Sequence, residues 1–291
     1  MSMPRYFKSA IAALLCLTGC VPSPKIAGIT PIKTWAAYYD DKLPAKTFEN
    51  VDLVVFDLRY HPKFDVLKGK TIVLAYVSAG EVHGDVPERQ ILQAKNLILY
   101  KNERWKSYAI DITASEWQKM VLNQIDDAEK KGFDGVMLDT IESPLYWAST
   151  QQPERLNAMR QGAADLIHKI RKSHPNMKIM VNRAFDILPM VAADIDYSLA
   201  ESILTNTNVS TGQFGLNPPD TYHQVAEQLR NVVALAPQLQ VFTLDYWKQD
   251  DVKGLERIYA EQRANGFTPY VNTPALNTYT PEPPRTHVHK R

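Results

Sequence analysis

Cysteine is almost absent from this chain of 291 residues, and its only two cysteines, Cys16 and Cys20, lie close to the N-terminus. A domain that begins after Cys20 has no disulfide bond and no thiol nucleophile. Cysteine chemistry is therefore excluded as the mechanism of such a domain.

An excess of charge of either sign is also missing, because 33 Lys and Arg residues stand against 32 Asp and Glu residues. A protein that binds nucleic acid needs a basic face to meet the phosphates. This balance gives no sign of such a face, and we expect no nucleic-acid partner.

The N-terminus has the pattern of an export signal over residues 1–19. Arg5 and Lys8 precede an apolar run, Ala10–Leu17, that is too short to cross a bilayer as a stable helix. The run closes with the letters LTGC, which resemble the lipobox of bacterial lipoproteins and imply that Cys20 becomes lipid-modified. The implied location is the bacterial cell envelope, with the protein anchored on the periplasmic side of the outer membrane. An ordinary secretory signal with an incidental cysteine is the alternative.

Proline marks the two ends of the predicted domain. Residues 20–34 contain three prolines and are predicted to be a tether. Residues 276–291 are rich in proline and charge, and we expect them to be loosely ordered. A single domain is therefore predicted over residues 35–275.

Short runs rich in apolar, β-branched and aromatic residues recur along this domain. Their hydrophobicity is continuous rather than alternating, which is typical of strands covered on both faces in a parallel sheet. The nine runs begin near residues 35, 52, 71, 108, 135, 178, 195, 241 and 268.

Segments with helical periodicity separate the runs, at 115–131, 154–173, 220–236 and 251–265. Ser115 with Gln118 forms a capping-box pattern at the start of the first of them, and Gly132 ends it. The alternation of strands and helices predicts an α/β fold, a (β/α)8 TIM barrel, with a doubly wound open sheet as the alternative. Nine strands are one too many for a simple barrel, so one lies outside the ring or is added at its closure.

Acidic and amide residues stand at or near the ends of the runs, where a TIM barrel places its active site. Seven acids on one rim would repel one another unless a cation, a shared proton or Lys and Arg partners compensate. The rim residues are Asp40, Asp57, Glu81, Asp111, Asp139, Asn182, Glu201, Asp245 and Asn272.

Other catalytic equipment is missing from the sequence. No serine lies in a G-x-S-x-G turn, and no glycine-rich phosphate loop is visible. The histidines do not end strands, which disfavours zinc or di-metal chemistry. Carboxylate chemistry remains, and two carboxylates that flank one bond are the standard equipment for glycoside hydrolysis.

Four motifs carry a resemblance to a known family: LAYVSAGE at 74–81, YAIDIT at 108–113, KKGFDGVMLDTIES at 130–143 and YSLAES at 197–202. In this order and spacing they resemble glycoside hydrolase family 114, the endo-α-1,4-polygalactosaminidases. The resemblance spans about residues 35–275. It implies a TIM barrel, a retaining endo-hydrolase that acts on galactosamine-rich polysaccharide, and no metal or other cofactor.

The family's two catalytic acids match Asp139 and Glu201. By analogy with α-retaining barrels, Asp139 is assigned as the nucleophile and Glu201 as the acid/base. Glu142 departs from the family pattern, in which an aspartate is expected near this position.

Substrate-binding roles are expected for further rim residues: acids that pair with substrate ammonium groups, aromatic rings that stack on sugars, and an amide that binds hydroxyls. The residues are Asp40, Asp57, Tyr76, Glu81, Glu142, Asn182, Asp245 and Tyr246, with Tyr38, Trp147 and Trp247 as further stacking candidates and Asn272 as a second amide that either binds hydroxyls or caps a loop. Residues 202–220 are long and polar enough to form a loop over the cleft. Two other functions stay open: a catalytically silent glycan-binding lipoprotein on the same barrel, and a metal-dependent hydrolase.

Overall fold

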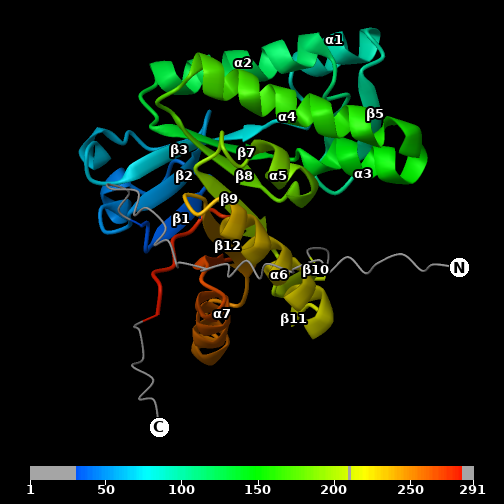
Figure 1. Ribbon diagram of the computed structural model, residues 1–291. Helices are drawn as coiled ribbons and strands as arrows, with labels where there is room; N and C mark the ends of the chain where they lie inside the picture. The colour runs from blue at the N-terminus through cyan, green and yellow to red at the C-terminus, as the bar shows by residue number, and fades with distance from the viewer. Residues whose placement is uncertain (1–30, 209–210, 284–291) are drawn as a thin grey trace, which may run out of the picture. The chain divides into compact units, whose positions relative to one another are not determined.

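Eight parallel strands form a nearly closed barrel within residues 31–208 and 211–283, the part of the chain that the computed structural model describes (Figure 1). The first and last strands lie next to each other, which brings the ends of the sheet together. In their order around the ring, the strands are β1 (Trp35–Tyr38), β2 (Leu53–Asp57), β3 (Ile72–Ser78), β7 (Gly135–Asp139), β8 (Lys178–Asn182), β9 (Tyr197–Glu201), β12 (Gln240–Tyr246) and β13 (Thr268–Asn272). The predicted TIM barrel is therefore confirmed.

The strands are buried on both faces, as their continuous hydrophobicity predicts. In β2, β7 and β9 the first four residues are buried and only the last is half-buried. That last residue is an acid in each case: Asp57, Asp139 or Glu201. The apolar part of each strand thus fixes the backbone that carries a carboxylate to the rim.

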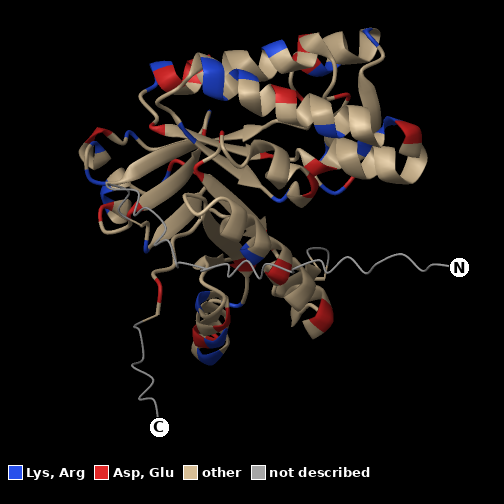
Figure 2. Ribbon diagram, viewed as in Figure 1, with Lys and Arg blue, Asp and Glu red and all other residues tan. Residues whose placement is uncertain are grey.

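Helices cover the outside of the barrel, and Figure 1 shows α2 and α4 lying alongside each other, with α2 packed against β3 and β7. The charged residues of the ribbon lie mainly on helices and loops (Figure 2). The helices are α1 (Glu88–Ala94), α2 (Ser115–Lys130), α3 (Glu142–Gln151), α4 (Leu156–Ser173), α5 (Leu188–Val191), α6 (Pro219–Leu235) and α7 (Val252–Ala264), with 3-10 turns η1 (Ala45–Phe48), η2 (Asp65–Leu67), η3 (Pro153–Arg155) and η4 (Phe185–Ile187).

The four helices expected from periodicity are present, but the capping box is not. Ala114 is the N-cap of α2, and its side chain accepts no capping bond. Gln118 instead donates to the carbonyl oxygens of Ile112 and Gly162 at 2.9 and 3.1 Å, because it is buried against α4. Gly132 ends the helix as predicted, in the left-handed conformation with φ +86°.

The surplus strand lies outside the ring. It is β6 (Ser107–Ile110), the middle strand of a small antiparallel sheet with β4 (Glu81–His83) and β5 (Ile98–Asn102). Asp111, which follows β6, is therefore not a member of the barrel rim. Its carboxylate accepts a hydrogen bond from Arg155 at 2.6 Å.

The segment after Glu201 forms a second addition to the barrel. Here β10 (Thr205–Asn208) and β11 (Gln213–Leu216) pair as an antiparallel hairpin, where the sequence predicted a loop. Its position is fixed by Asn217, whose amide donates to the carbonyl oxygens of Ser202, Ile203 and Thr205.

Part of the predicted tail packs on the barrel, contrary to expectation. The carbonyl oxygen of Leu276 accepts from Tyr39 N at 2.7 Å, and the Tyr279 ring lies 5.2 Å from the Phe48 ring. Apolar burial and these contacts order the chain in spite of its prolines. Cys20 and the predicted signal lie outside the described residues. Within the described ranges no helix has the length and apolar character needed to cross a membrane.

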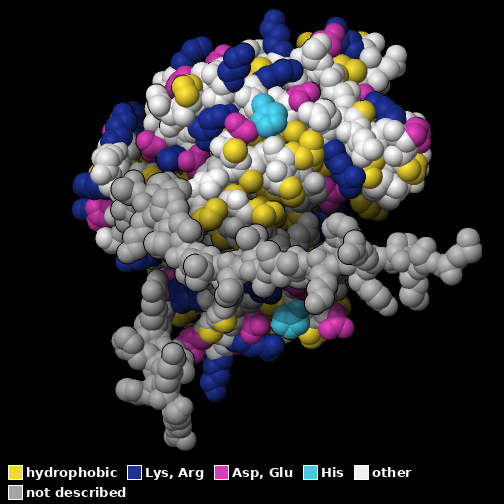
Figure 3. Space-filling model, in the orientation of Figure 1, with side chains coloured by type: hydrophobic (Ala, Val, Ile, Leu, Met, Phe, Trp, Pro, Cys, Tyr) yellow, Lys and Arg dark blue, Asp and Glu magenta, His cyan; other side chains and the backbone are white. Residues whose placement is uncertain are grey.

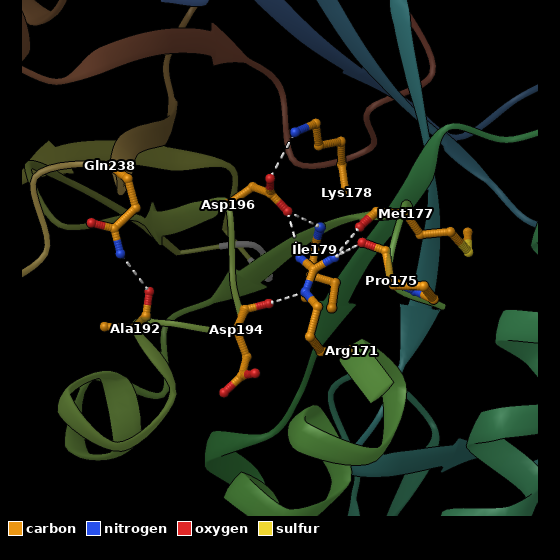
Figure 4. Close-up of polar contacts among 9 residues, drawn as sticks. All are labelled: Arg171, Pro175, Met177, Lys178, Ile179, Ala192, Asp194, Asp196 and Gln238. Carbon is orange, nitrogen blue, oxygen red and sulfur yellow. Dashed lines mark hydrogen bonds and ion pairs between the residues drawn. The ribbon is translucent and has the colours of Figure 1, made fainter. Parts of the chain in front are cut away.

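At the opposite edge from the rim, Arg171 joins α4 to the starts of β8 and β9 (Figure 4). Its guanidinium donates to the carbonyl oxygens of Asp194, Pro175 and Met177 and, at 2.7 Å, to the carboxylate of Asp196. Lys178 donates to the second oxygen of the same carboxylate. These bonds hold together the two strands that end in Asn182 and Glu201.

Candidate active site

Three neighbouring strands bring Asp139, Asn182 and Glu201 together at the rim. Each is the last residue of its strand, β7, β8 or β9, and parallel strands place these ends at one edge. Asn182 Nδ2 donates to Asp139 Oδ1 at 2.8 Å and to Glu201 Oε2 at 2.7 Å. Two oxygens bonded to one nitrogen at these distances lie no more than about 5.5 Å apart, which allows both carboxylates to act on one bond.

A tyrosine binds the other oxygen of each carboxylate. Tyr76 Oη donates to Asp139 Oδ2 at 2.9 Å, and Tyr246 Oη donates to Glu201 Oε1 at 2.8 Å. Tyr39, which the sequence did not single out, lies with its ring 5.0 Å from that of Tyr76. All four carboxylate oxygens therefore have a donor, which fixes both groups in one orientation.

Burial and mutual repulsion raise the pKa of three carboxyls at this rim. Burial raises the pKa of Asp139, although the bonds from Asn182 and Tyr76 oppose the rise. Burial and then the charge of Asp139 raise the pKa of Glu201. The same two causes raise the pKa of Glu142 to about 8. Carboxyls that do not ionise together provide the acid and the base that hydrolysis needs.

The chain turns sharply after each of the three site residues. Thr140, Arg183 and Ser202 follow Asp139, Asn182 and Glu201, and their φ angles are 64°, 53° and 53°. This left-handed conformation is strained for residues other than glycine, most of all for β-branched threonine. Strained backbone of this kind is concentrated at functional sites.

The turn after Asp139 is held by close contact with the β3–β4 connection. Thr140 Oγ1 accepts from Gly80 N at 3.0 Å and lies 2.9 Å from Ser78 Oγ. A Cβ on residue 80 would stand 2.0 Å from the carbonyl oxygen of Thr140, so only glycine fits there. Gly80, the glycine of the LAYVSAGE motif, thus supports the backbone beside Asp139.

A family model for glycoside hydrolase family GH114 matches residues 22–286. The chain belongs to family GH114. The glycoside hydrolase domain of PelA from Pseudomonas aeruginosa is 25% identical, with a TM-score of 0.77 over 87% of this chain and 99% of that chain. Family and fold together establish this protein as a glycoside hydrolase.

Two further proteins are similar to this chain, one in its structure and one in its sequence. Ega3 from Aspergillus fumigatus, solved in complex with galactosamine, is 18% identical, with a TM-score of 0.58 over 86% of this chain and 95% of that chain. An uncharacterized protein of Thermotoga maritima is 24% identical over 173 residues. That match covers 56% of this GH114 chain and 52% of the relative, so it spans about half the length of each.

Asp245 does not reach the cleft, contrary to prediction. Successive residues of a strand point to opposite faces. Tyr246 points into the barrel toward Glu201, so Asp245 points outward to α7, where it is fully buried. It accepts from Gln262 Nε2 at 2.6 Å and from Thr205 N and Oγ1 at 2.9 Å. Asp245 thus anchors the β10–β11 hairpin.

Glu81 is also misassigned as a substrate-binding residue. It lies beyond the end of β3, at the start of β4, and is 3% exposed. Its carboxylate accepts from Ser143 Oγ at 2.5 Å, from Asn102 Nδ2 at 3.1 Å and from Ser107 Oγ. Glu81 therefore joins the small antiparallel sheet to α3 and has no free face for a sugar.

Asp40 and Asp57 remain at the rim but are engaged locally. Asp40 accepts from Lys42 Nζ at 2.9 Å, and Asp57 Oδ1 accepts from the backbone N–H groups of Arg59 and Tyr60. Asp57 still adds to the field at the mouth: burial, then Asp139, Glu201 and Asp57 in turn, raise the pKa of Tyr39.

Several aromatic and amide candidates have structural roles. Tyr38 is fully buried against Phe48 and Phe56, so the prediction that its ring stacks on a sugar is wrong. Trp147 lies under the Arg155 guanidinium, and Trp247 donates to Asp251. Asn272 is buried, and its amide donates to Tyr270 Oη and to the carbonyl oxygen of Thr278.

Arg183 is a further site residue that the sequence did not single out. Its Nη1 donates to the carbonyl oxygen of Glu201 at 2.8 Å, and its Nε lies 3.7 Å from Glu142 Oε1. Its charge lowers the pKa of both acids, against the effect of burial. Within the described residues, no group of three or more His, Cys, Asp or Glu side chains is arranged to hold a metal ion.

Proposed function

We propose that this GH114 protein cleaves α-1,4-linked, galactosamine-containing polysaccharide within the chain and retains the anomeric configuration. The observation that carries the proposal is the single amide of Asn182 bonded to both Asp139 and Glu201. Retaining enzymes keep their two carboxyls about 5–5.5 Å apart, whereas inverting enzymes leave about 6.5–9.5 Å for a water molecule. The shared Asn182 limits the distance between Asp139 Oδ1 and Glu201 Oε2 to about 5.5 Å, and this close approach of one oxygen from each group favours the retaining class.

In the first step Asp139 attacks the anomeric carbon while Glu201 protonates the departing glycosidic oxygen. This forms a glycosyl–Asp139 ester and releases one end of the polysaccharide. Glu201 then takes a proton from water, and the water oxygen displaces Asp139 from the anomeric carbon. Both carboxyls return to their starting protonation states.

The environments of the two acids support this division of roles. An amide and a tyrosine hydroxyl stabilise the ionised form of each acid, Asn182 with Tyr76 for Asp139 and Asn182 with Tyr246 for Glu201. Burial and then the charge of Asp139 raise the pKa of Glu201, which favours Glu201 as the group that keeps its proton and acts as the general acid.

The substrate class rests on the family and on a relative. Ega3, which shares the fold, was solved with galactosamine. A rim with several carboxyls of raised pKa suits a polymer of amino sugars, because a cationic sugar relieves their repulsion.

Cleavage assays with defined galactosamine, N-acetylgalactosamine and glucosamine oligomers test the proposal. We expect products from galactosamine oligomers, and NMR should show that these products are first formed with the anomeric configuration retained. Asp139→Asn and Glu201→Gln should each remove the activity while leaving the circular dichroism spectrum unchanged. Binding without products in the wild type would favour a silent glycan-binding protein, and products of inverted configuration would refute the retaining mechanism.

We also propose that Cys20 is lipidated and anchors the enzyme in the bacterial cell envelope, on the periplasmic side of the outer membrane. Support comes from the LTGC pattern that ends at Cys20. The wild type should fractionate with membranes, and Cys20→Ala should accumulate as unprocessed precursor. Equal processing and fractionation of the two would refute the anchor.

A further inference from the structure

Helix α3 leads away from the carboxylate pair and presents an exposed aromatic ring. Glu142 is the first residue of α3, and Tyr146 lies one turn further on the same face. The Tyr146 side chain is 64% exposed, although its neighbours Leu145 and Ala148 are buried. An aromatic ring left in solvent next to an active site is available to stack on a ligand.

Tyr100 of β5 faces the same part of α3. Its hydroxyl interacts with Ser143, and partial burial raises its pKa, with Glu81, Glu142 and Tyr146 raising it further. Helix α3, which carries Glu142 and Tyr146, packs against β5, which carries Tyr100 and belongs to the small antiparallel sheet outside the ring. The sheet and the helix together extend the rim beyond Asp139.

The Glu142 carboxyl at this place has an unused acceptor. Its Oε2 is buried and has no hydrogen-bond partner among the described residues. Its Oε1 lies 3.7 Å from Arg183 Nε, which is too long for a hydrogen bond. A buried, unpaired carboxyl oxygen is costly, and a ligand that donates an N–H to it would remove that cost.

We propose that Glu142, Tyr146 and Tyr100 form an outer subsite that binds the amino-sugar unit next to the pair of units joined by the cleaved bond. The Tyr146 ring stacks on the apolar face of the sugar, and Glu142 accepts from its ammonium group. Charge-assisted bonds of this kind are about twice as strong as neutral ones, so the subsite selects free amines over N-acetyl groups. The inference rests on the proposed function, because the occupant is the same polysaccharide continuing past Asp139.

Chain-length dependence of cleavage tests the subsite. Tyr146→Ala should lower kcat/KM about three- to tenfold on long galactosamine oligomers and leave the shortest cleavable oligomer unaffected. Tyr146→Phe keeps the ring and should behave as wild type. Leu235→Ala, which removes a side chain that is 83% exposed at the end of α6, is the matched surface control and should change neither.

Selectivity for the amine is tested by calorimetry in a Glu201→Gln background, which removes turnover. Adding Glu142→Gln should abolish the preference for galactosamine over N-acetylgalactosamine oligomers, whereas adding Tyr146→Ala should weaken both to the same degree. An effect of Tyr146→Ala that is absent or equal at all lengths, or an amine preference that survives Glu142→Gln, overturns the subsite alone. If the wild type cuts no galactosamine oligomer and the Glu201→Gln protein binds none, the proposed function and the subsite both fail.

Discussion

Replacement of Asn182 by alanine should impair the enzyme far more than it destabilises the fold. Among the residues that the structure describes, only Asn182 donates a hydrogen bond to both Asp139 and Glu201, at 2.8 and 2.7 Å. Each hydrogen bond to a charged group contributes about 1.5–3 kcal/mol. Loss of one preorganised donor at a catalytic centre typically lowers kcat by about 10²–10³-fold, and we expect a loss of this size for Asn182→Ala.

The pH profile should change in a defined direction. The Asn182 bonds lower the pKa of both acids, so their removal raises it. Asp139 must be ionised to attack, and activity is lost as the pH falls through its pKa. The acidic limb of kcat/KM should therefore move to higher pH in Asn182→Ala.

Asn272→Ala is the matched control for this experiment. Asn272 is also a buried asparagine at the end of a barrel strand, but it bonds Tyr270 and Thr278 rather than a rim carboxylate. Both variants should lose similar stability in urea, and only Asn182→Ala should lose activity. If the acidic limb stays in place, or if Asn272→Ala loses as much activity, Asn182 does not position the pair.

Three further changes separate stability from catalysis. Glu142→Gln should raise the free energy of unfolding at pH 9 by about 1–2 kcal/mol after solvent screening, because the folded state raises the pKa of Glu142 from 4.5 to about 8 and so disfavours its ionised form. At pH 4 the carboxyl is protonated and the gain should vanish. A gain of the same size at both pH values would contradict this origin. Arg171→Lys should lower the free energy of unfolding by about 2–3 kcal/mol without changing KM. Lysine cannot replace the four hydrogen bonds that the Arg171 guanidinium makes at the start of β8 and β9 (Figure 4). An unchanged urea midpoint would refute this role. Thr140→Val should reduce kcat because it removes the hydroxyl bonded to Gly80, whereas Thr140→Ser should retain activity; equal kinetics in the two variants would show that the hydroxyl is dispensable.

The strands and the rim positions of the acids could be predicted because their signals are local, whereas the choice of Asp139 and Glu201 among nine rim residues came from the resemblance to glycoside hydrolase family 114. Continuous apolar runs identify buried parallel strands, and an acid at the end of such a run is costly unless the site needs it. Basic and acidic side chains are interspersed on the face that Figure 3 shows, consistent with the nearly equal numbers of the two kinds in the sequence. Alternation within β12 also contained the information that Asp245 and Tyr246 cannot share a face, but the prediction did not use it.

Glu81 could not be assigned correctly from local pattern. Its three partners, Asn102, Ser107 and Ser143, are distant in sequence and meet it only because the surplus strand β6 lies outside the ring. The nine runs alone did not reveal which strand was the extra one. In sequence, an acid with such partners cannot be distinguished from an acid such as Glu142, whose Oε2 has no hydrogen-bond partner among the described residues.

The turns that aim the site residues were invisible for a different reason. Glycine marks left-handed backbone in a sequence, but Thr140, Arg183 and Ser202 adopt it without being glycine. Each such residue costs about 1–3 kcal/mol and persists only where surrounding contacts over-determine it. Those contacts are non-local: Gly80 N to Thr140 Oγ1, Arg183 N to the carbonyl oxygen of Leu199, and Ser202 N to the carbonyl oxygen of Leu244. The direction of the Asp139, Asn182 and Glu201 side chains is therefore set by neighbouring strands, which explains why the sequence could place these residues at the rim but not orient them.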